Sequence, residues 1–133
     1  KALQEEGEKV TFSYVINDMD PMDGFPTYLN PSFKKYMGWP LFKIPSPKKG
    51  YSSFARYYAE QFIGVFNKLG AKPKIIWSSE YYQRGKFNQV IKEALDKVRK
   101  IRALYKKISH YDKPKSWYPF QVVCPRCGKV GTT

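Results

Sequence analysis

Two short apolar runs and two longer periodic segments predict the regular elements of this chain. The run "KVTFSYVIND" (9–18) is rich in β-branched and aromatic residues, which is typical of a strand buried on both faces. The run "KIIWSS" (74–79) has the same character. Between them, residues 52–70 place apolar side chains on one helical face, at Phe54, Tyr58, Phe62, Val65, Phe66 and Leu69. Strand, helix and strand in this order predict a right-handed parallel α/β unit.

The stretch between residues 18 and 50 shows no regular periodicity and holds six of the ten prolines. Within it, "PSFKKYMG" predicts one short helix with Pro31 near its start. The helix over 52–70 has its own boundary signals. The hydroxyl of Ser52 or Ser53 can cap its first turn, and Gly70 can end it.

Residues 86–109 predict one long helix. Its apolar positions are spaced alternately by four and three residues, at Phe87, Ile91, Ala94, Val98, Ile101, Tyr105 and Ile108. The lysines and arginines of this segment fall mostly off that seam. Two interpretations stay open: a solvated helix face, or a face that follows the phosphates of a nucleic acid.

The charge balance favours a polyanionic partner. The chain has 24 Lys and Arg against 11 Asp and Glu, a net charge of +13, and positive potential concentrates anions and speeds their encounter. The alternative is a protein that is merely basic, or a piece whose acidic partner region lies elsewhere. No run of residues is apolar enough for a membrane span or a signal peptide, and two cysteines make no disulfide framework. We therefore expect an intracellular, cytoplasmic protein and no membrane partner.

Cys124 and Cys127 have the spacing of half a zinc site. Two thiolates separated by two residues can share one tetrahedral ion, and Gly128 permits the tight turn behind them. A structural ion normally needs four ligands, and the one histidine, His110, lies in a probable linker over 110–119 that separates it from this turn. A redox pair and two inert thiols are the alternatives.

Three aspartates, Asp18, Asp20 and Asp23, follow the first predicted strand. Parallel sheets bind ligands beyond the carboxyl ends of their strands, and carboxylates there can hold Mg²⁺, an amine or a ribose hydroxyl. The alternative is a polar turn, because Asp favours turns. The sequence assembles no nucleophilic triad and no glycine loop for phosphate.

Several stretches taken together resemble the class I lysyl-tRNA synthetases. They cover nearly the whole chain in the family's order: "DMDPMDG" (18–24), "SFKKYMGWPLFKIPSP" (32–47), "YYAEQFIGVFNKLG" (57–70), "SEYYQRGKFNQVIKEALDKVRKIR" (79–102) and "WYPFQVVCPRCGKVGTT" (117–133).

The resemblance implies a partial Rossmann-type parallel sheet with helices, followed by a long helix and a zinc-knuckle-like insertion. Residues 1–78 would be part of the nucleotide-binding catalytic fold, and residues 79–133 the connective insertion. The parent enzyme would use ATP with Mg²⁺ to activate lysine and charge tRNA(Lys) in protein biosynthesis. Asp18 and Asp20 would edge the substrate pocket, Lys92, Lys97, Arg99 and Lys106 would contact tRNA, and Cys124 and Cys127 would bind Zn²⁺ as the first half of a knuckle.

The sequence departs from the family by lacking both of its ATP-handling signatures, the His-x-Gly-His motif and the Lys-Met-Ser-Lys-Ser-like loop. Those groups stabilise the charge that develops on the α-phosphate. We therefore expect this chain to be an internal fragment that carries no catalytic residue and is inactive alone. Two rivals stay open: a stand-alone basic RNA-binding module, and a small redox or metal-dependent protein organised around its two cysteines.

Overall fold

A computed structural model describes residues 2–131 of the chain. The chain divides into two compact units, Lys1–Ser79 and Glu80–Thr133. None of the described helices is both long and apolar enough to cross a membrane.

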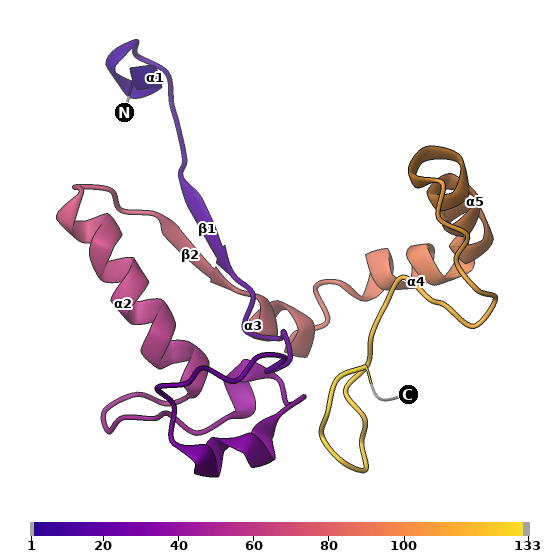
Figure 1. Cartoon of the computed structure of the whole chain (residues 1–133). Helices are drawn as coiled ribbons and strands as arrows, with labels where there is room; N and C mark the ends of the chain where they lie inside the picture. The colour runs from indigo at the N-terminus through magenta and orange to yellow at the C-terminus, as the bar shows by residue number, and fades with distance from the viewer. Residues whose placement is uncertain (1, 132–133) are drawn as a thin grey trace. The chain divides into compact units, whose positions relative to one another are not determined.

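The first unit is built on a parallel pair of strands, β1 (Ser13–Ile16) and β2 (Lys74–Trp77). The helix α2 (Phe54–Lys68) lies between them in the chain, as Figure 1 shows. The register aligns Ser13 with Lys74 and Ile16 with Trp77, so both strands end at the same edge. The predicted strand–helix–strand unit is confirmed. β1 is shorter than the predicted run because β2 offers it only four pairing residues.

One face of β1 packs against α2 through aromatic rings. The ring of Tyr14 lies 5.5 Å from that of Phe62 and 5.2 Å from that of Phe66, between centroids. Val15 points the other way and is 57% exposed. The prediction of a strand buried on both faces is therefore wrong for the described residues, since α2 covers one face only.

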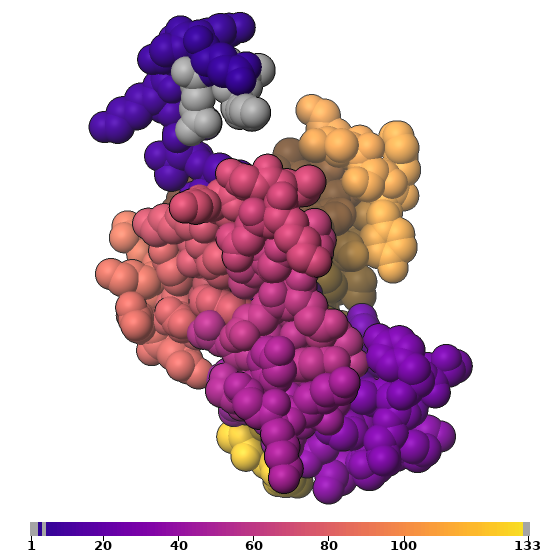
Figure 2. Space-filling model, turned by 90° about the vertical axis from the view of Figure 1, so that its left-hand side faces the viewer, coloured from indigo at the N-terminus to yellow at the C-terminus, as the bar shows by residue number. Residues whose placement is uncertain are grey.

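The proline-rich stretch after β1 folds into a small core. It contains two 3-10 helices, η1 (Pro31–Tyr36) and η2 (Leu41–Lys43), and the predicted short helix at Pro31 is confirmed. Its buried side chains cluster with the start of α2 as Met22, Leu29, Ile44 and Phe54. In the space-filling view these segments form one continuous body (Figure 2).

Backbone hydrogen bonds tie this stretch to the end of β1. The amide of Leu41 donates to the carbonyl of Asp20 at 2.9 Å, and the amide of Phe42 donates to that of Asp18 at 3.0 Å. The boundaries of α2 are those its sequence predicts. Ser53 Oγ accepts from the amide of Arg56 at 3.2 Å, and Gly70 follows the helix with φ of 71°.

The helix α3 (Ser78–Gln83) begins directly after β2, and the second unit continues with α4 (Asn88–Asp96) and α5 (Val98–Ser109). The predicted single helix over 86–109 is therefore wrong in one respect: it is interrupted at Lys97, whose ψ of 12° leaves the helical range. The spacing of the apolar seam is unchanged across this residue. The break therefore could not be predicted from the hydrophobic periodicity.

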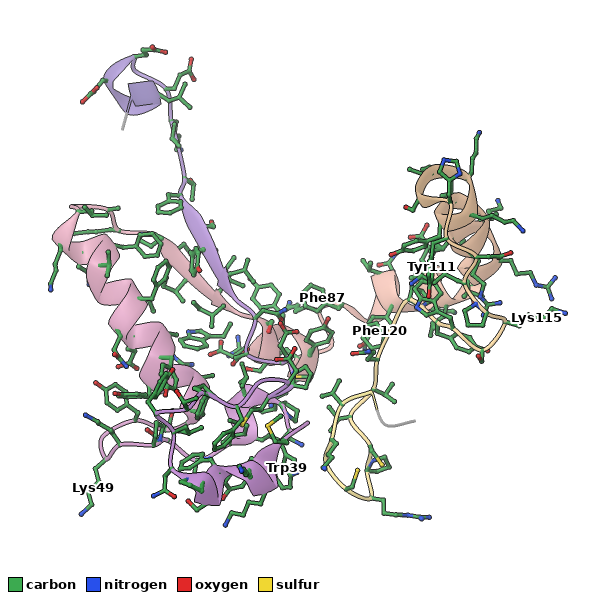
Figure 3. The ribbon with its side chains drawn as sticks, viewed as in Figure 1. Trp39, Lys49, Phe87, Tyr111, Lys115 and Phe120 are labelled. Carbon is green, nitrogen blue, oxygen red and sulfur yellow. The ribbon has the colours of Figure 1, made fainter. Side chains whose placement is uncertain are left out.

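An extended segment returns along the helices of the second unit. The ring of Trp117 lies 5.3 Å from that of Tyr105 on α5, and the ring of Phe120 lies 6.0 Å from that of Tyr82. Figure 3 shows Phe120 beside α4. The segment ends in a tight hairpin closed by an antiparallel bridge between Val123 and Val130.

Candidate functional site

The carboxylate of Asp18 lies at the shared carboxyl edge of β1 and β2 and binds the first turn of α3. Asp18 is 3% exposed. Its Oδ1 accepts from Ser78 Oγ at 3.0 Å and from the amide of Ser79 at 2.8 Å. Its Oδ2 accepts from Ser79 Oγ at 2.6 Å. A carboxylate at a helix N-terminus satisfies amides that have no partner within the helix. Asp18 therefore joins the ends of two strands that are about 60 residues apart in the sequence.

The other two aspartates of the motif are in different surroundings. Asp20 and Asp23 are exposed. The backbone of Asp20 bonds to Asn17 and Leu41, which fixes its position beside the strand end. Asp23 lines a separate pocket of about 410 Å³ with Met22, Phe25 and other residues of the proline-rich stretch. The structure thus separates one buried carboxylate from two that are open to solvent.

A pocket of about 430 Å³ lies between β1 and α2. Residues 14–18 form one wall, and the side of α2 that carries Phe54, Tyr58 and Phe62 forms the other. Asp18 contributes to its lining, so the pocket reaches the carboxyl edge of the sheet. Its volume lies within the range of small-molecule sites, about 300–1,000 Å³.

Tyr58 brings a phenol to this pocket. Burial raises the pKa of Tyr58 from 10.0 to about 12, and its hydrogen bond with Tyr28 adds to the rise. The group is therefore a neutral hydroxyl throughout the physiological range, able to donate or accept one hydrogen bond.

Positive charge is concentrated in the second unit. Residues 80–133 hold 13 of the 24 Lys and Arg but only 4 of the 11 Asp and Glu. All four cations predicted to contact tRNA lie exposed on α4, on α5 or at the break between them: Lys92, Lys97, Arg99 and Lys106. This part of the chain therefore presents the stronger field to an anionic partner.

Two of these four cations are in ion pairs. Lys97 pairs with Glu93, whose pKa is lowered by the hydrogen bond with Lys97 and by its charge. Lys106 Nζ lies 2.7 Å from Asp112 Oδ2, and the hydrogen bond and charge of that carboxylate raise the pKa of Lys106. Such exposed pairs are weak and exchange readily with phosphate.

Two further cations, Arg102 and Lys113, were not among the predicted contacts. Arg102 Nε donates to the carbonyl of Trp117 at 3.0 Å, and its Nη2 donates to the carbonyls of Trp117 and Lys115. Lys113 Nζ lies 4.5–5.1 Å from the ring centroids of Tyr105, Tyr111 and Trp117. Figure 3 labels Tyr111 and Lys115 in this region. The alternation of lysines with aromatic residues in "HYDKPKSWYP" (110–119) is the sequence pattern from which this cluster of cations and rings could have been predicted.

Cys124 and Cys127 lie in the tight hairpin near the end of the described chain. The amide of Cys124 donates to the carbonyl of Lys129 at 2.7 Å, and the amide of Gly128 donates back to Cys124 at 2.8 Å. Gly128 has φ of 73°, a left-handed conformation that glycine adopts without strain. Among residues 2–131 no group of three His, Cys, Asp or Glu is placed to hold a metal ion. The turn therefore offers two sulfur ligands, whereas a structural zinc ion normally has four ligands.

Comparison with known sequences assigns the chain to a family. The sequence model of the family described as tRNA synthetases class I (K) matches residues 1–133. The chain belongs to this family. The resemblance found in the sequence to the class I lysyl-tRNA synthetases is thereby confirmed.

Proteins similar to this class I synthetase chain carry the name lysine–tRNA ligase. One from Picrophilus torridus is 33% identical over 127 residues, which are 96% of this chain and 25% of that protein. One from Thermoplasma volcanium is 31% identical over 133 residues, 100% of this chain and 26% of that protein. One from Methanosarcina barkeri is 29% identical over 133 residues, again 100% of this chain and 25% of that protein. The chain spans about a quarter of the length of the curated relatives it matches.

Proposed function

We propose that this chain is part of a lysine–tRNA ligase, which activates lysine with ATP and Mg²⁺ and esterifies it to tRNA(Lys). The observation that carries the proposal is the family match over residues 1–133, together with relatives named for that activity. The parallel pair β1–β2 is consistent with part of a Rossmann-type fold. It carries a carboxylate and a pocket at its carboxyl edge, where such folds bind ligands.

The two parts of the chain have different roles in this proposal. Residues 1–78 belong to the nucleotide-binding catalytic fold, and residues 79–133 form a connective insertion that contacts tRNA. The pocket between β1 and α2 supports the first role. The excess of cations after residue 79 supports the second. The cytoplasm is where such an enzyme meets its tRNA.

We assign Asp18 and Asp20 distinct tasks at the edge of the substrate pocket. Asp18 is a positioning residue, because its oxygens are engaged by Ser78 and Ser79. It holds the start of α3 against the end of β1. Asp20 is exposed and is the carboxylate that can meet the ammonium group of a substrate or a metal-bound water.

Lysine-dependent ATP–pyrophosphate exchange, measured with tRNA present, tests the proposed reaction in the full-length protein that the gene encodes. We expect exchange with lysine and none with the other amino acids. We expect residues 1–133 alone to give no exchange, because the groups that stabilise the α-phosphate are not among them. Exchange by the full-length protein with another amino acid would contradict the proposal. No exchange, with RNA binding kept, would favour the stand-alone RNA-binding module.

The tRNA-contacting role is tested by charge reversal on α4 and α5. The triple change Lys92→Glu, Lys97→Glu and Arg99→Glu removes three of the proposed phosphate partners. We expect weaker tRNA binding and a salt slope reduced by roughly two to three, at about 0.9 for each phosphate that is no longer neutralised. Phosphate contacts position RNA without reading its sequence, so unrelated tRNAs should be affected alike.

A matched control reverses three exposed lysines of the other unit, Lys48, Lys49 and Lys72. This control changes the net charge by the same amount. If it lowers the salt slope as much as the α4–α5 triple does, the effect is one of overall charge and the proposed face is only a solvated surface.

We also propose that Cys124 and Cys127 supply two ligands of a structural zinc ion. The hydrogen-bonded turn with Gly128 supports this, since zinc knuckles use the same spacing and trailing glycine. Two thiolates would leave two positions for ligands outside residues 2–131. Zinc analysis of the chain alone and of the full-length protein, with Cys124→Ser as control, tests it. Absence of zinc from both proteins contradicts the assignment, and a reactive thiol of low pKa would favour the redox alternative.

A further inference from the structure

The second unit contains a pocket that none of the assignments above uses. It has a volume of about 380 Å³ and is lined in part by Trp117, Tyr118 and Phe120, with Leu95 of α4 on one side. Ser116 and Gln121 add a hydroxyl and an amide to the same lining. This volume is near the lower limit for small-molecule sites, about 300–1,000 Å³, so the pocket suits one planar group rather than a long chain.

Aromatic side chains make the pocket a stacking surface. Tyr118 is 54% exposed, so much of its surface is open to a ligand. The backbone beneath it is held in place, because Arg102 donates to the carbonyls of Lys115 and Trp117. A ring whose backbone is already held loses less conformational entropy on stacking than a ring on a free segment would. The pocket is therefore prepared to receive a flat group before that group arrives.

Cations surround these rings. The guanidinium carbon of Arg102 lies 5.5 Å from the ring centroid of Tyr118, and Lys113 Nζ lies 5.1 Å from that of Trp117. Lys115 is exposed and lies between Lys113 and Trp117 in the sequence, and Figure 3 labels it on the segment that returns from α5. Aromatic rings interleaved with cations are the arrangement with which proteins bind single-stranded nucleic acid, bases on the rings and phosphates on the cations.

We infer that this pocket binds one unpaired nucleotide of an RNA whose duplex lies on the basic helices. The base stacks on Tyr118, its polar edge faces Ser116 and Gln121, and its phosphates meet Arg102, Lys113 or Lys115. Bases inside a duplex have both faces covered by their neighbours, so the ligand is an unpaired or flipped-out base. The inference rests on the proposed RNA-binding role of this unit and adds a site to it.

Two RNA hairpins with the same stem test the inference on the full chain. One is blunt, and the other carries a short unpaired tail with 2-aminopurine, whose fluorescence changes on stacking. We expect tighter binding of the tailed hairpin. We expect Tyr118→Ala to remove the added affinity, roughly 5- to 150-fold, and to leave the blunt hairpin unaffected. Tyr118→Phe should keep the added affinity because it keeps the ring.

Tyr28→Ala is the matched control, since Tyr28 is an exposed tyrosine of the first unit, at 74%. It should change neither hairpin's affinity. Equal binding of the two hairpins by the unchanged chain would overturn the inference, as would an equal loss for both hairpins with Tyr118→Ala. Displacement of the tail by adenosine monophosphate at the same concentration as by tailed RNA would also overturn it, and would indicate a mononucleotide site.

Failure of the proposed RNA-binding role gives a different result. In that case neither hairpin binds in a salt-dependent way, and Tyr118 makes no difference. Salt-dependent binding of both hairpins with no effect of the tail instead keeps the RNA-binding role and rejects the pocket alone.

Discussion

At the scale of single residues, burial divides the aspartates of "NDMDPMDG" (17–24) into two kinds. Asp18 is enclosed and bonded to Ser78 and Ser79, whereas Asp20 and Asp23 face solvent. A short acidic motif thus combines one carboxylate that joins two strand ends with two carboxylates that are open to solvent. Identical side chains two residues apart consequently have different expected effects when they are replaced.

Asp18→Ala should destabilise the first unit by about 1–3 kcal/mol, because it leaves the buried amide of Ser79 and two hydroxyls without their acceptor. Asp20→Ala should change stability by less than about 0.5 kcal/mol, as exposed substitutions usually do. Urea unfolding followed by tryptophan fluorescence measures both, since Trp39 and Trp77 belong to this unit. Equal effects of the two changes would contradict the positioning role of Asp18.

The raised pKa of Tyr58 predicts how the stability of the first unit changes at alkaline pH. Its pKa is raised to about 12 by burial and by Tyr28, so the unfolded chain loses the phenol proton at lower pH than the folded chain does. The contribution of Tyr58 is therefore complete below pH 10 and is lost as pH rises from about 10 to 12. Unfolding measured over this range should show a shallower loss of stability for Tyr58→Phe. Parallel pH profiles of the variant and the unchanged chain would exclude this linkage.

At the scale of elements, the strand–helix–strand unit and the caps of α2 could be predicted from the sequence because each depends on local pattern. Ser53 and Gly70 bound α2 as their residue types predict. The partners of Asp18 could not be predicted, since Ser78 and Ser79 reach it across about 60 residues of chain. The break at Lys97 was missed because it preserves the apolar spacing, and Arg102 was missed because its acceptors are backbone carbonyls.

Arg102 fixes the returning segment to α5 through several donors directed at the carbonyls of Lys115 and Trp117. Arg102→Lys keeps the charge but removes the planar fork that bonds both carbonyls. We expect amide hydrogen exchange over residues 111–120 to become roughly tenfold faster, since three charge-assisted bonds to two carbonyls are weakened or lost. Arg99→Lys, at an exposed position of the same helix, should leave exchange unchanged. Equal exchange in the two variants would show that the aromatic contacts alone hold the segment.

At the scale of the whole molecule, the two units differ in net charge and in the pockets they carry. The first unit carries a small parallel sheet with a pocket at its edge. The second carries most of the net positive charge and the exposed rings near Trp117. The family match extends over both. The function proposed above assigns lysine activation to the part of the enzyme that contains the first unit, and contact with RNA to the second unit.

The most direct test of the proposed function is tRNA charging by the full-length protein, with each amino acid offered separately in labelled form. We expect lysine to be attached to tRNA(Lys) and no other amino acid to be attached to any tRNA. We also expect Asp18→Ala to lower the charging rate while RNA binding is kept. Attachment of a different amino acid, or no attachment by a folded protein that binds tRNA, would contradict the proposed function.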